Sequence, residues 1–193
     1  MEFQCIALTV LTAFYGCYFA KMFQQKRQGI QTDQLGKGKA EFEKFVEIAM
    51  KTAAVLVAAV ELGSIFLGTG RFPVPFRIAG AALSVLGTVL FIAAVLTMRD
   101  SWWAGVSKTD KTRLVTTGVY QLSRNPAFMG FDLLYAGVLL MFFNGVLCAA
   151  TVLAILLYHL QIVHVEEVFL RAAFGEEYSR YRKKVCRYLG RKW

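Results

Sequence analysis

The chain has 193 residues, of which 56% are hydrophobic and 18% are charged. Soluble domains usually contain about 45–50% apolar residues, so this composition excludes an ordinary soluble domain and indicates a membrane protein. The formal net charge of +9 does not predict nucleic-acid binding, because the basic residues flank apolar runs, where lipid headgroups would meet them.

Five apolar runs predict an all-α, polytopic integral membrane protein with about five transmembrane helices. A helix needs about 20 apolar residues to span a bilayer. In chain order, the predicted spans are 3–20, 45–67, 76–98, 127–143 and 146–165. The fourth is short, so we expect it to tilt little or to end below the far surface. The first follows Glu2 and has no small-residue cleavage pattern, so we expect it to be retained.

The basic residues predict the orientation of these spans. Six lie in 21–44, five in 99–124 and eight after residue 165, which together are 19 of the 22 lysines and arginines. Five spans place all three segments on one side of the membrane. By the positive-inside rule, this side is cytoplasmic. We therefore expect the N-terminus outside and the C-terminus in the cytoplasm.

The organisation predicts one membrane domain, with three N-terminal spans in 1–98 and a cofactor-binding part in 99–193. Asn144 and Gly145 form the only turn signal between the last two spans, and this signal predicts an antiparallel helical hairpin. The expected partners are the lipid bilayer and a small or lipophilic molecule, with no nucleic acid and no obligate protein partner.

Polar residues inside predicted spans are candidates for function. Glu61 has no basic residue one turn away, and we expect Arg71 or a neighbouring helix to supply its partner. His159 and His164 are five residues apart and so lie on different parts of the helix surface. We expect each to form a hydrogen bond between helices, and we predict no metal site.

Unusual polar residues concentrate before the fourth span, in the stretch GVYQLSRNPAFMG at 118–130. Pro126 suits the first position of a helix, where a missing N–H costs nothing. Arg124 and Asn125 would then lie at the positively polarised end of that helix, which can hold a carboxylate or a phosphate. Glu166 and Glu167 end the antiparallel fifth span, so we expect them at the same depth.

A ligand with a carboxylate, a cationic group and a flat ring would use this whole set, and S-adenosylmethionine is one such ligand. Arg124 or backbone amides would bind the carboxylate, and Glu166 the ammonium or the ribose. Tyr120, Phe128 or Tyr178 would face the adenine or the sulfonium. A dinucleotide would satisfy much of the same set. The residues are also consistent with an ordinary helix start and a solvated helix end.

The order of the motifs resembles the isoprenylcysteine carboxyl methyltransferase family and, more distantly, the membrane phospholipid N-methyltransferases. The segments are LVTTGVYQLSRNPAFMG, an apolar hairpin, EE, and FGEEYSRYRKKVCR, and they cover roughly residues 97–188. The resemblance implies a membrane methyltransferase with S-adenosylmethionine in a cytoplasmic pocket, formed by the last helical hairpin and the C-terminal tail. The cofactor-binding residues it implies are Thr112, Arg113, Leu114, Val115, Tyr120, Arg124, Asn125, Pro126, Ala127, Phe128, Glu166 and Glu167.

Three positions differ from the family pattern. Asn125 replaces a histidine and Phe128 a tyrosine, and both changes are compatible with cofactor binding. Ile162 stands where the prenylcysteine enzymes carry an arginine linked to the acceptor carboxylate, which argues against a prenylcysteine acceptor. The acceptor therefore stays open among carboxylates, thiols and amines. A thiol or an amine would have to lose a proton, with His164 or Glu167 as possible bases.

Two other functions are compatible with parts of the sequence. Sterol-type reductases that use NADPH carry a similar RxPxYxG segment, but they usually place a glutamate after its glycine, where this chain has Phe131. A non-catalytic transporter or assembly subunit would use Glu61, Asp132 and His159 as an intramembrane polar path. Their spacing shows no inverted repeat of the transporter kind.

Overall fold

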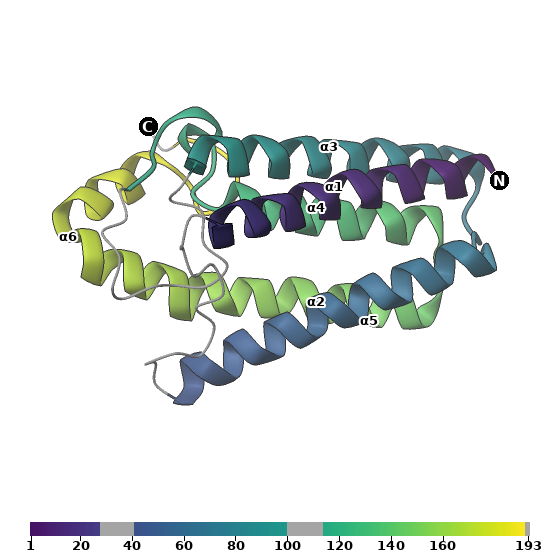
Figure 1. The fold of residues 1–193 in the computed structure, drawn as a ribbon, viewed down its shortest axis with the longest axis horizontal. Coiled ribbons are helices and arrows are strands. Elements are labelled where there is room, and N and C mark those ends of the chain that lie inside the picture. The colour runs from purple at the N-terminus through teal and green to yellow at the C-terminus, as the bar shows by residue number, and fades with distance from the viewer. Residues whose placement is uncertain (28–40, 100–113, 192–193) are drawn as a thin grey trace.

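The computed structural model describes residues 1–27, 41–99 and 114–191, which form an elongated bundle of helices (Figure 1). Within these ranges there is no β-strand, and a single bridge joins Val185 to Arg191. The predicted all-α class is therefore confirmed. The elements are α1 (Glu2–Arg27), α2 (Glu41–Leu67), α3 (Val74–Met98), η2 (Gly118–Gln121), α4 (Pro126–Met141), α5 (Gly145–Gln161), η3 (Ile162–Glu166) and α6 (Glu167–Lys184).

Four helices are long and apolar enough to cross a membrane: α1, α2, α3 and the continuous helix Gly145–Lys184. Helix α4 has 16 residues, or about 24 Å of length at 1.5 Å per residue. This is less than the hydrocarbon core of about 30 Å. The predicted multi-pass membrane protein is confirmed, and so is its short fourth helix.

The fifth predicted span, 146–165, lies within a longer helix. The polar tail predicted after it is helical at its start, because α5 continues through the π-helical segment η3 into α6. The chain bends within α6 at Gly175, whose φ is 44°. Glycine adopts this left-handed conformation without steric cost. Hydrophobicity does not predict this extension, because α6 lies beyond the apolar run.

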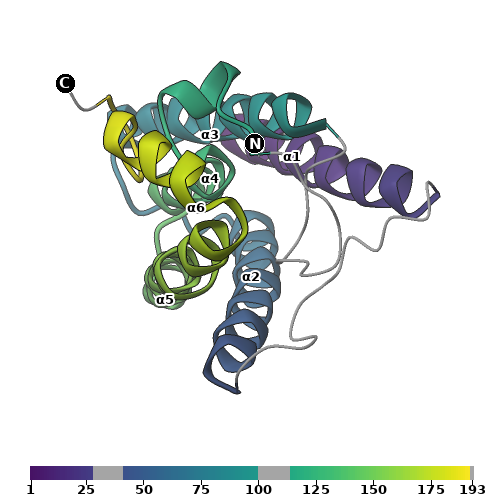
Figure 2. The same cartoon turned by 90° about the vertical axis from the view of Figure 1, so that its left-hand side faces the viewer.

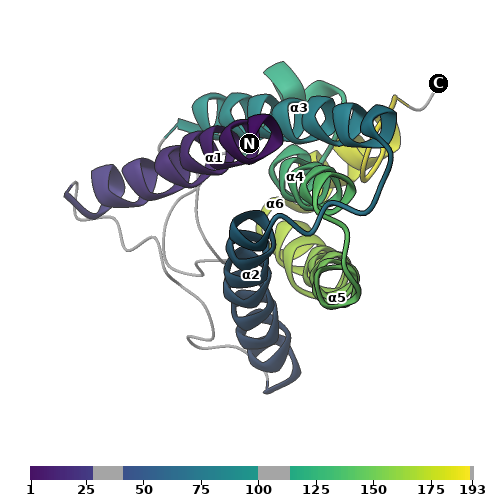
Figure 3. The ribbon, with the colours of Figure 1, turned by 90° about the vertical axis from the view of Figure 1, so that its right-hand side faces the viewer.

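The helices alternate in direction, so their ends gather in two groups (Figures 1 and 3). One end of the bundle, which we call the basic end, holds the last turns of α1 and α3, the first turns of α2 and α4, and all of α6. The N-terminus and the turns between α2 and α3 and between α4 and α5 form the opposite end. The predicted grouping of the basic segments agrees with this arrangement. That the basic end faces the cytoplasm stays a prediction.

Helix α4 lies at the centre of the bundle, between α3 and α5 (Figure 2). Glycines bring the backbones of α3 and α4 together. A Cβ atom on Gly137 would be 2.5 Å from the carbonyl oxygen of Gly80, and one on Gly87 would be 2.6 Å from that of Gly130. Small residues allow this close approach, which stabilises helix pairs in membranes by van der Waals contact.

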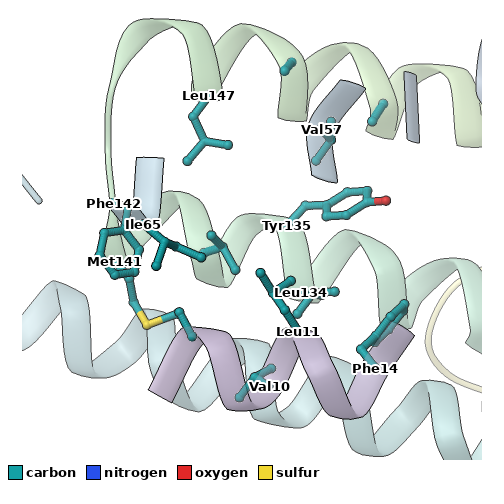
Figure 4. Close-up of a cluster of buried hydrophobic side chains, with 14 of the residues drawn as sticks. Val10, Leu11, Phe14, Val57, Ile65, Leu134, Tyr135, Met141, Phe142 and Leu147 are labelled. Carbon is teal, nitrogen blue, oxygen red and sulfur yellow. The ribbon is translucent and has the colours of Figure 1, made fainter. Parts of the chain in front are cut away.

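Apolar side chains from α1, α2, α3, α4 and α5 form the main core, part of which Figure 4 shows. Phe14 of α1 is fully buried, stacks on Phe91 at 4.2 Å between ring centroids, and meets Phe131 edge-on at 4.7 Å. These contacts fix α1 against both α3 and α4.

The predicted turn between α4 and α5 is confirmed at the opposite end. The Oδ1 atom of Asn144 accepts a hydrogen bond from the Leu147 backbone at 2.9 Å, which caps α5. Its Nδ2 atom donates to Ser64 Oγ of α2 at 2.8 Å. The same side chain therefore starts α5 and ties the hairpin to α2.

Candidate functional site

Three separate parts of the chain meet at the basic end: residues 114–128, the junction of η3 and α6, and the C-terminal residues 178–191. They contain most of the motifs that the sequence analysis singled out. The predicted meeting of the 118–130 stretch with the Glu166–Glu167 pair is observed in the fold.

Arg124 connects all three parts. Its Nη1 atom lies 3.0 Å from Glu167 Oε1 and donates a hydrogen bond of 2.9 Å to the Tyr178 hydroxyl. The Arg124 and Glu167 side chains are only 5% and 1% exposed. Tyr178, one of the three rings predicted to face an adenine or a sulfonium, is buried and accepts this hydrogen bond from Arg124.

Glu167 is also bound by two further arginines. Arg187 donates to both of its carboxylate oxygens, at 2.8 and 3.1 Å, and Arg171 lies 3.4 Å from Oε2. Burial acts to raise the pKa of Glu167, but the Arg187 hydrogen bond and the charges of Arg124 and Arg187 outweigh it, so the pKa is lowered. Because this carboxylate is fully engaged and its pKa is low, Glu167 is a poor candidate for a general base.

The C-terminal residues 185–191, which we call the tail strap, pair with the backbone before α4. The Arg124 amide donates to the Cys186 carbonyl at 3.1 Å, and the Gly190 amide donates to the Leu122 carbonyl at 2.8 Å. Asn125 Nδ2 donates to the Arg187 carbonyl at 3.0 Å. The tail strap was missed by sequence reasoning, because its polar residues show no periodicity that would predict pairing.

A tyrosine from α6 holds the same backbone from a second direction. The Tyr181 hydroxyl donates to the Tyr120 carbonyl at 2.6 Å. Leu114 packs beside Tyr181 and Tyr178 in a small apolar cluster. The predicted cofactor residues Leu114 and Tyr120 therefore lie beside α6, whereas Thr112 and Arg113 lie outside the described residues.

The start of α4 matches its prediction. Pro126 is the first residue of the helix, and Asn125 before it is not helical, with φ of −134° and ψ of 53°. Ala127 and Phe128 follow, both half-buried. Phe128 meets the Tyr158 ring edge-on, with 5.4 Å between the centroids. The first turn of α4 therefore aims backbone N–H groups at the basic end.

Glu166 lies on a different side of the junction from Glu167. It is half-buried, and Gln161 Nε2 approaches its Oε1 atom at 3.4 Å. Burial, the Tyr181 hydroxyl and the charge of Glu166 all raise the pKa of Tyr120. The charge of Glu166 therefore acts on Tyr120, and the predicted role of both residues in cofactor binding stays a prediction.

Gln161 is a candidate that the sequence analysis missed. It is fully buried, and its Oε1 atom has no hydrogen-bond partner among the described residues. It directly precedes the π-helical segment η3, a rare conformation that is frequent at functional sites. A glutamine inside the predicted fifth span, between Leu160 and Ile162, was the signal that could have found it.

The two histidines are placed differently from each other. His159 Nδ1 hydrogen-bonds to the Tyr188 hydroxyl of the tail strap, so it joins α5 to the tail. His164 is exposed and meets Phe42 of α2 edge-on at 5.6 Å. His159 forms a hydrogen bond as predicted, but to the tail strap and not to another helix, while for His164 the structure shows a ring contact.

These features define an α-helical, multi-pass membrane protein with a polar, arginine-rich site at one end of the bundle. Residues 76–177, more than half of the chain, match the phospholipid methyltransferase family. The chain belongs to this family.

Several relatives extend the comparison. A probable protein-S-isoprenylcysteine O-methyltransferase of Oryza sativa subsp. indica is 32% identical over 108 residues, which are 55% of this chain and 56% of the relative. Protein-S-isoprenylcysteine O-methyltransferase B of Arabidopsis thaliana is 28% identical over 108 residues, 55% of each chain. The Homo sapiens protein-S-isoprenylcysteine O-methyltransferase is 31% identical over 110 residues, 56% of this chain and 39% of the relative.

The chain thus spans about half the length, or less, of these relatives. Their names confirm the resemblance to the isoprenylcysteine methyltransferases that the motifs indicated. The matched region begins at residue 76, two residues after the start of α3. It continues through α4, α5 and η3 and ends at residue 177 of α6.

Proposed function

We propose that this protein is an integral-membrane methyltransferase, which transfers a methyl group from S-adenosylmethionine to a lipophilic acceptor at the cytoplasmic face. The observation that carries the proposal is the meeting of the family's motifs at one end of the bundle, through Arg124, Glu167 and Tyr178. The family match also favours this function over the reductase and transporter alternatives.

The residues at the basic end fit the amino-acid part of such a donor. Arg124 Nε is buried and has no hydrogen-bond partner among the described residues, and the same holds for Gln161 Oε1. An α-carboxylate needs a hydrogen-bond donor and an α-ammonium needs an acceptor. Arg124 and Gln161 offer one of each, and Glu166 adds a half-buried carboxylate.

S-adenosylmethionine, when bound, supplies a methyl group on a positively charged sulfur. Glu166 and Gln161 would hold its ammonium, and Arg124 with the first amides of α4 would hold its carboxylate. Phe128 and Tyr120 supply aromatic surface beside these groups. These residues would hold the methyl group and the acceptor atom about 3–3.5 Å apart and would exclude water.

The general base that we propose depends on the acceptor. Glu167 is held by three arginines, and exposed His164 lies against Phe42 of α2. A carboxylate acceptor would need no base at neutral pH. For an amine or a thiol, Glu166 is the better candidate, because its half-buried carboxylate lies in the same environment as Tyr120.

Calorimetric titration with S-adenosylhomocysteine in neutral detergent tests the proposal. The parent protein is expected to bind, and Glu166→Gln to weaken binding by about tenfold or more, because a hydrogen bond to a charged group is lost. Glu177→Gln changes an exposed carboxylate of α6 and serves as the control. NADPH is titrated in parallel.

Binding by the parent and the control, together with weak binding by Glu166→Gln, would support the proposal. Absence of S-adenosylhomocysteine binding by folded parent protein would overturn it. Binding of NADPH instead would return the function to the reductase alternative.

A further inference from the structure

A second group of polar side chains lies inside the bundle, away from the basic end. It consists of Tyr15 of α1, Glu61 of α2, Asp132 and Tyr135 of α4, and Tyr158 of α5, and we call it the inner cluster. The Tyr135 and Tyr158 hydroxyls form a hydrogen bond of 3.1 Å. Four helices that are distant in sequence therefore contribute to one polar region.

The acidic residues of the inner cluster lack partners. Glu61 is fully buried, and neither of its carboxylate oxygens has a hydrogen-bond or ion-pair partner among the described residues. The prediction that Arg71 or a neighbouring helix would pair with Glu61 is wrong within that part of the chain. Asp132 Oδ1 is likewise buried and without a partner there.

These groups lie in one part of the core. Tyr135 and Tyr158 belong to the same buried cluster as Val57, and Tyr15 packs against it. Glu61 is one turn from Val57 on the buried face of α2, and Figure 4 shows Val57 next to Tyr135. The unpartnered Glu61 carboxylate therefore lies in the part of the core that holds these tyrosines.

The inner cluster occupies the middle of the bundle. Glu61 is six residues before the end of α2 at the opposite end, and Asp132 is six residues after the start of α4 at the basic end. Each is about 9 Å from its helix end at 1.5 Å per residue. Phe128, at the proposed donor site, contacts Tyr158 edge-on, so the inner cluster begins next to that site.

The chemistry of the inner cluster selects a cation. A carboxylate in a membrane interior is costly unless it holds a proton or meets a positive charge. Two carboxylates would repel an acceptor that carries a carboxylate or a phosphate. Among the described residues, no group of three metal-ligating side chains gathers here or elsewhere. Tyrosine rings with a carboxylate are the surroundings in which proteins bind ammonium groups.

We propose that the inner cluster binds the ammonium group of a membrane-soluble amine, with Glu61 as its counter-ion and Tyr15, Tyr135 and Tyr158 around it. The inference does not rest on the proposed activity. Tyr15 and Glu61 lie outside the region that matches the family, so the family match assigns no role to either residue.

A series of ligands with equal alkyl chains tests this site. Purified protein in dodecyl maltoside, a detergent without an amine, is titrated with dodecylamine, dodecanol and dodecanoic acid. Binding is measured by native mass spectrometry and by the shift of the thermal unfolding midpoint. Dodecylamine is expected to bind at least about tenfold more tightly than the alcohol, the size of one charge-assisted hydrogen bond.

Glu61→Gln keeps the shape of the side chain and removes its charge. It is expected to abolish the preference for the amine without lowering the ligand-free unfolding midpoint, because no protein partner is lost. Tyr15→Phe provides a second variant and is expected to weaken amine binding several-fold. Glu177→Gln, at an exposed position of α6, is expected to behave like the parent.

The site is supported if the amine preference is present in the parent and lost in Glu61→Gln. Equal binding of the amine and the alcohol by the parent would overturn it. An amine preference that persists in Glu61→Gln and Tyr15→Phe would also overturn it.

Discussion

Arg124 and Glu167 form an ion pair of 3.0 Å, and both side chains are almost completely buried. The pair joins the segment before α4 to the first residue of α6, so it links the RNP and EE motifs. Because Arg187 of the tail strap binds the same carboxylate, one glutamate holds the basic end together.

The first prediction concerns the rank of three alanine variants at this ion pair. Glu167→Ala removes the shared carboxylate and leaves Arg124 buried without its charge partner, at an expected cost of about 3–5 kcal/mol. Arg124→Ala leaves Glu167 paired with Arg187 and is expected to cost about 1–3 kcal/mol. Arg171 is 49% exposed, so Arg171→Ala is expected to cost at most about 1 kcal/mol. Chemical unfolding followed by circular dichroism measures the order, and equal losses would contradict it.

The second prediction concerns the pH dependence of stability. The pKa of Glu167 is lowered in the folded protein. Its stabilising contribution is therefore complete above the unfolded value of about 4.3, and it is lost as the pH falls through the lower folded value. Unfolding midpoints measured from pH 6 to pH 3 should fall more steeply in the parent than in Glu167→Gln. Parallel pH profiles would show that the ion pair contributes no such stability.

The third prediction concerns the contact between α3 and α4. Gly137→Ala places a methyl group 2.5 Å from the Gly80 carbonyl oxygen, and we expect a loss of about 1–3 kcal/mol from overpacking. Gly63→Ala is the matched control, because nothing lies within 4 Å of its added Cβ. The control should be neutral or slightly stabilising, since alanine is the better helix former. Similar effects of the two variants in thermal unfolding would argue against the close helix contact.

The fourth prediction uses the position where asparagine replaces the family's usual histidine. Asn125 donates a hydrogen bond to the Arg187 carbonyl at 3.0 Å. Histidine can keep a donor there, whereas Asn125→Asp turns the donor into an acceptor that faces a carbonyl oxygen. We expect Asn125→Asp to free the tail strap and to speed its cleavage in limited proteolysis. Asn125→His should remain resistant, and equal cleavage of both variants would contradict this role.

Much of the fold could be predicted from the hydrophobic runs, because a membrane helix is recognised by its length and apolar composition. The first four predicted spans agree with α1 to α4 within a few residues, apart from an extra turn or two at the basic ends of α1 and α2. The pairing of α3 with α4 was not accessible. It depends on glycines such as Gly80 and Gly137. These glycines lie inside apolar runs like many others, and only the structure shows which of them are in contact.

At the basic end, the ordered motifs predicted which segments would meet, but not the role of each residue. The first glutamate of the Glu166–Glu167 pair is left half-buried beside Tyr120, while the second is surrounded by arginines. Consecutive residues of a helix point in different directions, and the π-helical segment η3 lies directly before Glu167. The sequence pattern did not reveal this local change of helix geometry.

The most direct test of the central claim is methyl transfer itself. Purified protein in nanodiscs is incubated with S-adenosylmethionine carrying a radioactive methyl group, in the presence of lipid-soluble carboxylates, thiols and amines. We predict that the radioactive methyl label enters the organic phase with at least one acceptor class. Glu166→Gln is expected to lower the rate of methyl transfer, whereas Glu177→Gln is not. Folded parent protein that leaves all three classes unlabelled would contradict the account.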